Sequence, residues 1–236
     1  MRGKNAPVQA ATPGDDAIWF RDDTAAVGLN FVHEAGPVGR YFMPQVMGSG
    51  AALLDYDNDG RFDLYLVQNG GPASTARNKL FHQRADGRFE DVSAGSGLDI
   101  SGYGMGVAVG DIDNDGFADV YISQYGGGRL FRNRGNGTFQ DITRSAGVEQ
   151  SSWGTSCCFV DYDRDGWLDL VVVNYVEYDA GYPCGPASGK RDYCHPSVFP
   201  GSAMRLFHNR GRDASGHWLG FEDVTQSAGV AKRGPG

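Results

Sequence analysis

The sequence DYDNDGRFD at residues 55–63 occurs in two further versions, DIDNDGFAD at residues 111–119 and DYDRDGWLD at residues 161–169. Each version has aspartate at positions 1, 3, 5 and 9 and glycine at position 6. A chain that wraps around an ion must turn sharply at position 6, where glycine meets no steric penalty. The repetition therefore predicts three ion-binding loops of one kind.

Calcium is the ion that suits this pattern. Ca²⁺ takes six to eight oxygen ligands, which four carboxylates, the backbone carbonyl of position 7 and a water would supply. Without a cation the four negative charges would repel one another and weaken the fold. We expect about three Ca²⁺ sites, with ligands from the side chains of Asp55, Asp57, Asp59, Asp63, Asp111, Asp113, Asp115, Asp119, Asp161, Asp163, Asp165 and Asp169 and from the backbone carbonyls of Arg61, Phe117 and Trp167.

Neither an ordinary turn nor a helix-flanked calcium loop accounts for these residues as well. Aspartate and glycine are common in ordinary turns, but a turn needs one or two such residues, whereas each loop has five. The helix-flanked calcium loop needs a glutamate at position 12, where this chain has Leu66, Ile122 and Val172. The residues on both sides of each loop are small, β-branched or aromatic, which is typical of strands.

A second unit also repeats and completes the picture of a repeat array. Phenylalanine, aspartate, Ser or Thr, glycine and an apolar residue recur at fixed offsets four times, beginning at Phe20, Phe89, Phe139 and Phe221. We interpret it as a short strand followed by one helical turn, which Ser or Thr caps and glycine ends in the left-handed conformation. A further strand precedes each of the last three copies, joined to it by a polar turn.

The chain is thus predicted to be all-β, with blades of four antiparallel strands that form part of a β-propeller. The Gly- and Ala-rich strand before each loop suits the innermost position, where blades converge. We expect a disordered segment over residues 1–17, propeller repeats over 18–231 with blades at about 40–98, 99–148 and 149–230, and a tail over 232–236.

Three blades fall short of the four to eight that close a ring. The first unit, at Phe20, would add one leading strand, the last strand of a missing blade. The chain is therefore expected to be a fragment of a longer propeller or to assemble with another copy of itself.

Charge and composition agree with ion binding. The net charge is −8, but without the 12 loop aspartates 17 acidic residues face 21 Lys and Arg, so the rest of the chain carries +4. No run of basic residues suggests nucleic acid. No apolar stretch approaches the roughly 20 residues of a membrane span.

The longest insertion lies between Val176 and Met204 and contains two of the four cysteines, Cys184 and Cys194. Their spacing permits a disulfide in an oxidising compartment, and the alternative is two free thiols in a cytosolic protein. Cys157 and Cys158 take the places of small residues in the other repeats, and we expect both in the core.

No catalytic motif is present, so the chain is not expected to be an enzyme. It has no Gly-x-Ser-x-Gly, no His-Glu-x-x-His and no phosphate-binding glycine loop followed by Lys-Ser/Thr. His82 and His208 occupy the position of Arg132 in the middle repeat, which suits an exposed strand face more than a metal ligand.

The Asp-x-Asp-x-Asp-Gly-x-x-Asp loops and the Phe-x-Asp-x-Thr units resemble those of FG-GAP (VCBS-like) repeat proteins, and more closely those of the cartilage acidic protein (ASPIC/UnbV) family. The resemblance covers about residues 18–231. It implies a calcium-stabilised propeller, related to the ligand-binding head of integrin α-subunits, that is secreted or exported and acts by adhesion. Family members usually have more blades and a C-terminal domain.

These observations predict a calcium-binding, non-enzymatic module for protein or glycan recognition outside the cytoplasm, in the extracellular space or the periplasm. The alternative is a lectin or a polysaccharide-acting enzyme that uses the insertion at 178–200. Ligand contacts would then come from Tyr182, Arg191, Tyr193 and His195.

Overall fold

Each aspartate loop joins two antiparallel strands, as the apolar stretches around it predict. The structure is a computed structural model that describes residues 20–37, 39–185 and 189–232. The segment expected to be disordered, 1–17, and most of the expected tail lie outside these residues.

The described strands form three separate four-stranded antiparallel sheets, each with its strands in chain order. We call each sheet a blade. Blade 1 contains β1 (Ala51–Leu54), β2 (Asp63–Leu66), β3 (Lys79–Gln83) and β4 (Phe89–Asp91). Blade 2 contains β5 (Tyr103–Gly110), β6 (Asp119–Tyr125), β7 (Arg129–Asn133) and β8 (Phe139–Asp141). Blade 3 contains β9 (Gly154–Val160), β10 (Asp169–Asn174), β11 (Arg205–Asn209) and β12 (Phe221–Asp223). Two short 3₁₀ helices, η2 (Met43–Val46) and η3 (Pro196–Val198), lie outside the sheets.

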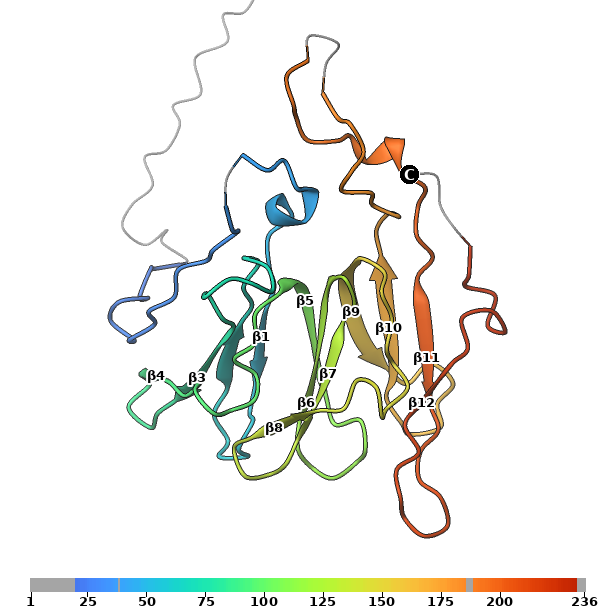
Figure 1. The fold of residues 1–236 in the computed structure, drawn as a ribbon. Coiled ribbons are helices and arrows are strands. Elements are labelled where there is room, and N and C mark those ends of the chain that lie inside the picture. Colours follow the sequence, from blue (N-terminus) through green and yellow to red (C-terminus); the bar gives the residue numbers. More distant parts are fainter. Residues whose placement is uncertain (1–19, 38, 186–188, 233–236) are drawn as a thin grey trace, which may run out of the picture.

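The blades stand side by side in chain order, with the first strand of blade 2, β5, in contact with both β1 and β9 (Figure 1). Small residues make this approach possible. A Cβ added to Gly50 in front of β1 would lie 2.7 Å from the carbonyl oxygen of Met105, and one added to Gly106 would lie 3.1 Å from the Cα of Ser156. The structure is therefore all-β and propeller-like, with small residues at the innermost position as predicted.

The core lies between neighbouring blades. Tyr65 and Leu80 of blade 1 pack in one buried cluster with Ile122 and Phe131 of blade 2. A second cluster joins blade 2 to blade 3 in the same way. Burying such side chains stabilises each interface by roughly 1.5–3 kcal/mol per residue.

The unit that begins with phenylalanine also connects blades. After β8 the chain makes a turn in which Gly147 has φ +78°, and the turn's Ala146 carbonyl accepts a 2.8 Å hydrogen bond from the backbone N–H of Phe221 in blade 3. Ser96 accepts from Phe139 in blade 2 in the same manner, at 2.7 Å. The predicted helical turn ended by a left-handed glycine is present, and it also holds the next blade. Its cap is an aspartate rather than the predicted Ser or Thr, because Asp141 Oδ1 accepts the Thr143 N–H at 3.0 Å while the Thr143 hydroxyl accepts the N–H of Leu130.

Two expectations about individual segments are wrong. The leading strand at Phe20 is not formed: residues 20–23 pair with no strand in the described structure, and the Phe20 side chain is 93% exposed. A strand needs a neighbour for its backbone groups, and no described segment lies beside residues 20–23 as a strand. Only the turn that follows is kept, with Val27 accepting a 2.7 Å hydrogen bond from Phe89.

Cys158 is the second correction. Successive residues of a strand point to opposite faces, so Cys157 packs against the core between blades 2 and 3 whereas Cys158 is exposed.

Among the described residues there is also no helix with the length and apolarity that crossing a bilayer requires.

Candidate metal sites

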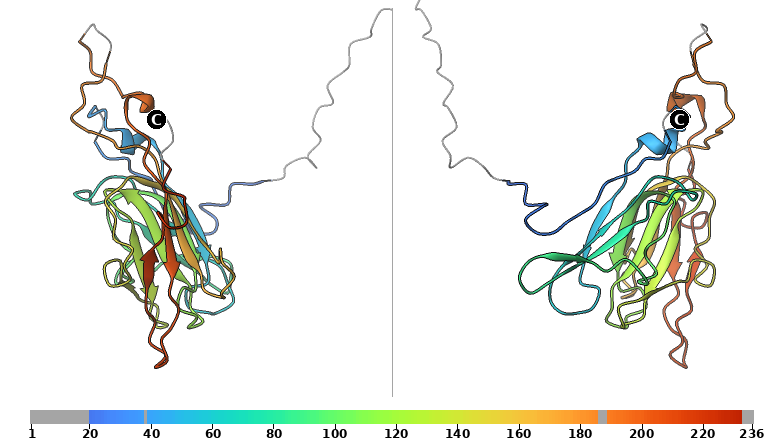
Figure 2. Two further views of the ribbon diagram at one scale, coloured as in Figure 1. Left: turned by 90° about the vertical axis from the view of Figure 1, so that its right-hand side faces the viewer. Right: turned by 60° about the vertical axis from the view of Figure 1, so that its left-hand side comes forward.

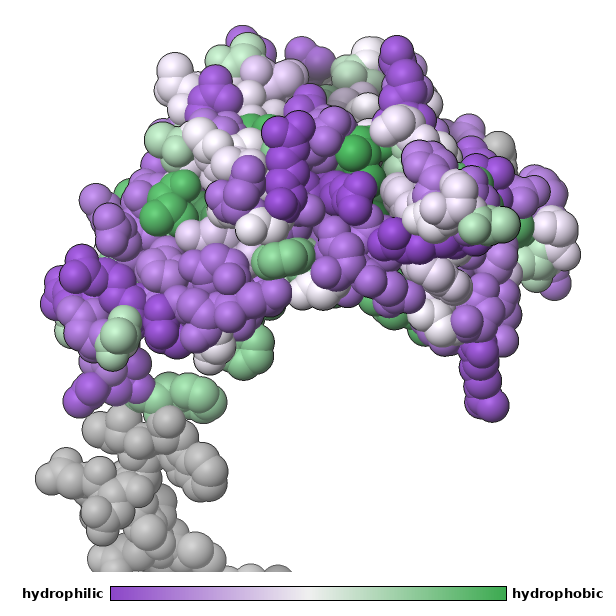
Figure 3. Space-filling view, turned by 90° about the horizontal axis from the view of Figure 1, so that it is seen from below, coloured by the Kyte–Doolittle hydropathy of each residue, from purple (hydrophilic) through white to green (hydrophobic). Residues whose placement is uncertain are grey.

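The three aspartate loops lie together at one end of the array, the lower end in Figure 1. Asn58 of the first loop donates a 2.8 Å hydrogen bond to the carbonyl oxygen of Gly116 in the second loop. Asn114 repeats this contact with Gly166 of the third loop, at 3.2 Å. Figure 3 looks onto this end, where hydrophilic side chains predominate. The loops therefore form a continuous polar rim.

The first aspartate of each loop fixes the loop backbone. The Oδ1 atom of Asp55 accepts from the N–H of Asp59 at 3.0 Å, and its Oδ2 accepts from Gly60 at 2.9 Å. Asp111 and Asp161 make the same pair of bonds in the other loops, at distances between 2.8 and 3.1 Å. The position 6 glycines have φ between +84° and +91°, as the sharp turn requires.

The aspartate at position 9 of each loop is fully buried at the start of the second strand. Asp119 accepts hydrogen bonds from the N–H groups of Asn133 at 2.7 Å and Ile112 at 3.0 Å. Burial, helped by the nearby charges of Asp113 and Asp115, raises its pKa to about 8 despite those hydrogen bonds. Burial likewise raises the pKa of Asp63 and Asp169. Such sites favour a cation that offsets the negative charge.

The remaining carboxylates converge within each loop. One oxygen from each member of three triads lies within 4.8 Å of the others: Asp55, Asp57 and Asp63; Asp111, Asp113 and Asp115; Asp161, Asp163 and Asp165. Asp113 is fully buried, and although Arg132 ion-pairs with it, neither of its carboxylate oxygens accepts a hydrogen bond among the described residues. An all-oxygen donor set with a buried, unsatisfied carboxylate fits Ca²⁺.

The residue at position 7, whose backbone carbonyl is a predicted calcium ligand, also stabilises the loop. The N–H groups of Arg61, Phe117 and Trp167 each donate to the position 5 carboxylate of their loop, at 2.9–3.0 Å. The indole of Trp167 also packs against the turn at Gly211, where an added Cβ would lie 2.8 Å from its Nε1. Position 7 therefore ties each loop to its own blade.

Residues on the third strand complete the sites, and the sequence did not reveal them. His82, Arg132 and His208 were expected on an exposed strand face, but the side chain of each points at the aspartate loop of its own blade. The two histidines are half-buried. The sequence offered one clue to this role: each of the three residues follows Leu-Phe at the same place in its strand.

Residues 55–122 and 115–172 match the model of the FG-GAP-like repeat family. The two matches together cover half of the chain. The chain belongs to the FG-GAP-like repeat family. It is also 33% identical over 81 residues to cartilage acidic protein 1 of Xenopus tropicalis and 32% identical over 81 residues to that of Homo sapiens. Each alignment covers 34% of this chain and 12% of the relative, so the chain spans only a small part of those relatives.

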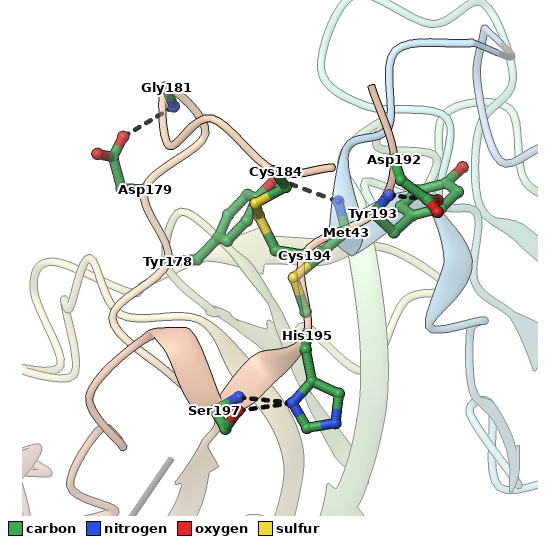
Figure 4. The surroundings of a disulfide bond; sticks show 10 residues. All are labelled: Met43, Tyr178, Asp179, Gly181, Cys184, Asp192, Tyr193, Cys194, His195 and Ser197. Atoms are coloured by element: carbon green, nitrogen blue, oxygen red, sulfur yellow. Dashed lines mark hydrogen bonds between the residues drawn. A yellow bond between two sulfur atoms is a disulfide. The ribbon is translucent and has the colours of Figure 1, made fainter. Parts of the chain in front are cut away.

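The insertion of this FG-GAP chain lies at the opposite end from the loops, above the blades in Figures 1 and 2. The predicted disulfide between Cys184 and Cys194 is present, with the Cα atoms 5.0 Å apart (Figure 4). The insertion is anchored to the segment around η2, because the Tyr178 hydroxyl accepts a hydrogen bond from the N–H of Met43 at 3.3 Å.

The four predicted ligand contacts in the insertion do not form one group. Tyr182 and Arg191 line the same pocket. Tyr193 instead packs edge-on against Tyr41, with ring centroids 5.3 Å apart, and His195 Nδ1 lies 2.7 Å from the Ser197 hydroxyl (Figure 4). Of the four, Tyr182 and Arg191 thus share one candidate ligand site in the described part of the insertion.

Proposed function

We propose that the chain is a calcium-stabilised, non-enzymatic propeller module that recognises a protein or a glycan outside the cytoplasm. The observation that carries the proposal is the threefold repetition of one loop, with the same backbone hydrogen bonds and a convergent set of carboxylates in each blade. Membership of the FG-GAP-like family supports it.

The energetic case rests on repulsion between carboxylates. Three carboxylate oxygens lie within 4.8 Å of one another in each loop, and burial makes the charged form of Asp113 and Asp119 costly. A divalent cation at the centre of each loop converts this repulsion into attraction. The loops also join the first two strands of each blade and touch one another, so ion binding would stabilise all three blades.

Thermal unfolding with and without calcium tests the proposal. Saturating a site a hundredfold above its Kd contributes about 2.7 kcal/mol, so Ca²⁺ should raise the Tm by several degrees and EDTA should reverse the gain. Asp57→Asn should weaken the effect, whereas Asp86→Asn, in a hairpin turn away from the loops, should not. An unchanged Tm on adding calcium and EDTA in turn would refute calcium binding.

Recognition is assigned to the insertion end. The disulfide supports an oxidising, extracellular location, because such bonds are rare in the cytosol. Tyr182 is 44% exposed beside a pocket of about 460 Å³ that is also lined by Lys190 and Arg191. An exposed aromatic ring next to cationic side chains suits an acidic glycan or an acidic peptide segment.

The pocket also supports the alternative of a lectin. A glycan array would identify sugar binding, and Arg191→Ala should abolish it whereas Arg84→Ala, an exposed arginine of blade 1, should not. Binding to a protein ligand with no signal on the array would leave the adhesion module as the better description.

A further inference from the structure

One side chain from the third strand faces the aspartate loop in every blade. His82 is the fourth residue of β3, and Arg132 and His208 hold the same place in β7 and β11. The imidazole Nδ1 of His82 lies 3.1 Å from Asp63 Oδ1 and 3.5 Å from Asp57 Oδ2. We call this place the cross-strand position.

Blade 3 repeats the arrangement of blade 1. The Nδ1 atom of His208 lies 3.2 Å from Asp169 Oδ1 and 3.4 Å from Asp163 Oδ2. Two neighbouring ligands of one ion, each about 2.1–2.2 Å from it, are about 3 Å apart. The two contacts at 3.1 and 3.2 Å are hydrogen bonds. Their spacing is also that of two ligands of one ion, so a metal that displaces the bridging proton could bind the imidazole nitrogen and the carboxylates together.

Blade 2 differs because Arg132 fills the cross-strand position. Its guanidinium ion-pairs with Asp113 and lies 3.2 Å from Asp115 Oδ2. Arginine is always protonated and has no lone pair to give to a metal. The buried Asp113 carboxylate, which accepts no hydrogen bond within the described structure, is thus balanced by a fixed organic cation. This contact independently marks the cross-strand position as a place where positive charge is needed.

Ligand type decides which ions these loops accept. Calcium takes oxygen ligands, whereas an imidazole nitrogen is a common ligand of first-row transition metals. Two carboxylates and one imidazole lie within 4.8 Å of one another in both blades: Asp57, Asp59 and His82, and Asp163, Asp169 and His208. No such group is found around Arg132 among the described residues.

We propose that the cross-strand residue sets the ion preference of each loop, so that the loops of blades 1 and 3 bind a divalent transition metal through His82 and His208 while the loop of blade 2 does not. This inference rests on the proposed function, because it uses the same loops. Beyond that function, it states that two of the loops have a nitrogen ligand. The chain then has two classes of metal site, and the cross-strand residue determines the class.

The test uses Mn²⁺ as the probe and the full chain. Electron spin echo spectroscopy detects coupling between bound Mn²⁺ and a ligating imidazole nitrogen. We expect two nitrogen-coupled Mn²⁺ ions per chain, one after His82→Arg and three after Arg132→His. His33→Gln is the matched control, because that ring contacts Ser49 away from the loops and should leave the count at two.

The Arg132→His variant keeps the test informative even if His82→Arg fails to fold, since it predicts a gain. Bound Mn²⁺ without nitrogen coupling, or a count that Arg132→His leaves unchanged, would overturn the inference. A rise in Tm with Ca²⁺ alongside that result would leave the proposed function standing. No response of the Tm to either ion would overturn both.

Discussion

Replacing Gly147 by alanine tests whether the turn after each blade holds the next one. Gly147 has φ +78°, and an added Cβ would lie 2.8 Å from the carbonyl oxygen of Phe221 in blade 3. The left-handed conformation costs alanine about 1 kcal/mol. The crowding adds about 1–3 kcal/mol, because the backbone it meets cannot move aside freely. We expect Gly147→Ala to lower the free energy of unfolding by about 2–4 kcal/mol.

Gly229 supplies the matched control. It holds the same position after blade 3 with φ +73°, but no atom lies within 4 Å of where its Cβ would be. Gly229→Ala should therefore cost only the conformational part, about 1 kcal/mol. Urea unfolding of both variants in the presence of calcium measures the difference. Equal losses of stability would refute the idea that this turn carries the contact between blades.

Three further predictions follow from the core, the loops and the insertion. Leu130→Ala should lower the free energy of unfolding by about 2–5 kcal/mol, because Leu130 is completely buried between blades. Leu206→Ala, at the equivalent place in blade 3, should cost less, since no further blade covers Leu206 in the described structure. Urea unfolding of the two variants measures the difference. The pKa of Asp119 is about 8 in the folded protein, above its value in the unfolded chain. Stability in EDTA should therefore fall as pH rises from about 4 to 8, by at most about 1.4 kcal/mol per pH unit. Asp119→Asn should flatten this slope, and a steeper slope in the variant would contradict the role of Asp119. Cys184→Ser should speed hydrogen exchange in the insertion but not in the blades, and faster exchange throughout would show that the disulfide supports the whole fold.

The sequence predicted most of the architecture because the features that specify it are local. Each loop contains its own turn residue and its own carboxylates, and apolar strands flank it directly. The helical turn ended by Gly147 could be predicted for the same reason. Local signals, however, do not say which neighbour a strand will have, so the strand expected at Phe20 is absent. They also do not determine which face of the sheet a side chain points to, which is why Cys158 was wrongly expected in the core.

The candidate sites were predictable only in part. The aspartates that converge lie within nine residues of one another, whereas His82 comes from a different strand and reaches the loop only through the pairing of β2 with β3. That pairing places Phe81 opposite Leu64 and so puts the following histidine beside Asp63. In the insertion the opposite happened, because Tyr182 and Tyr193 are close in sequence but the fold sends their rings to different neighbours.

The turn over residues 23–29 gives the array a direction. Its Val27 carbonyl already holds the Phe89 N–H, so any blade set in front of blade 1 would have to compete with the chain's own segment for that donor. Behind blade 3 there is no such competitor in the described structure, and Val173 there is 43% exposed, whereas its counterpart Val67 in blade 1 is 1% exposed. The two ends thus differ in their backbone contacts: the donor in front of blade 1 is already used, whereas blade 3 leaves the apolar surface at Val173 for an added repeat.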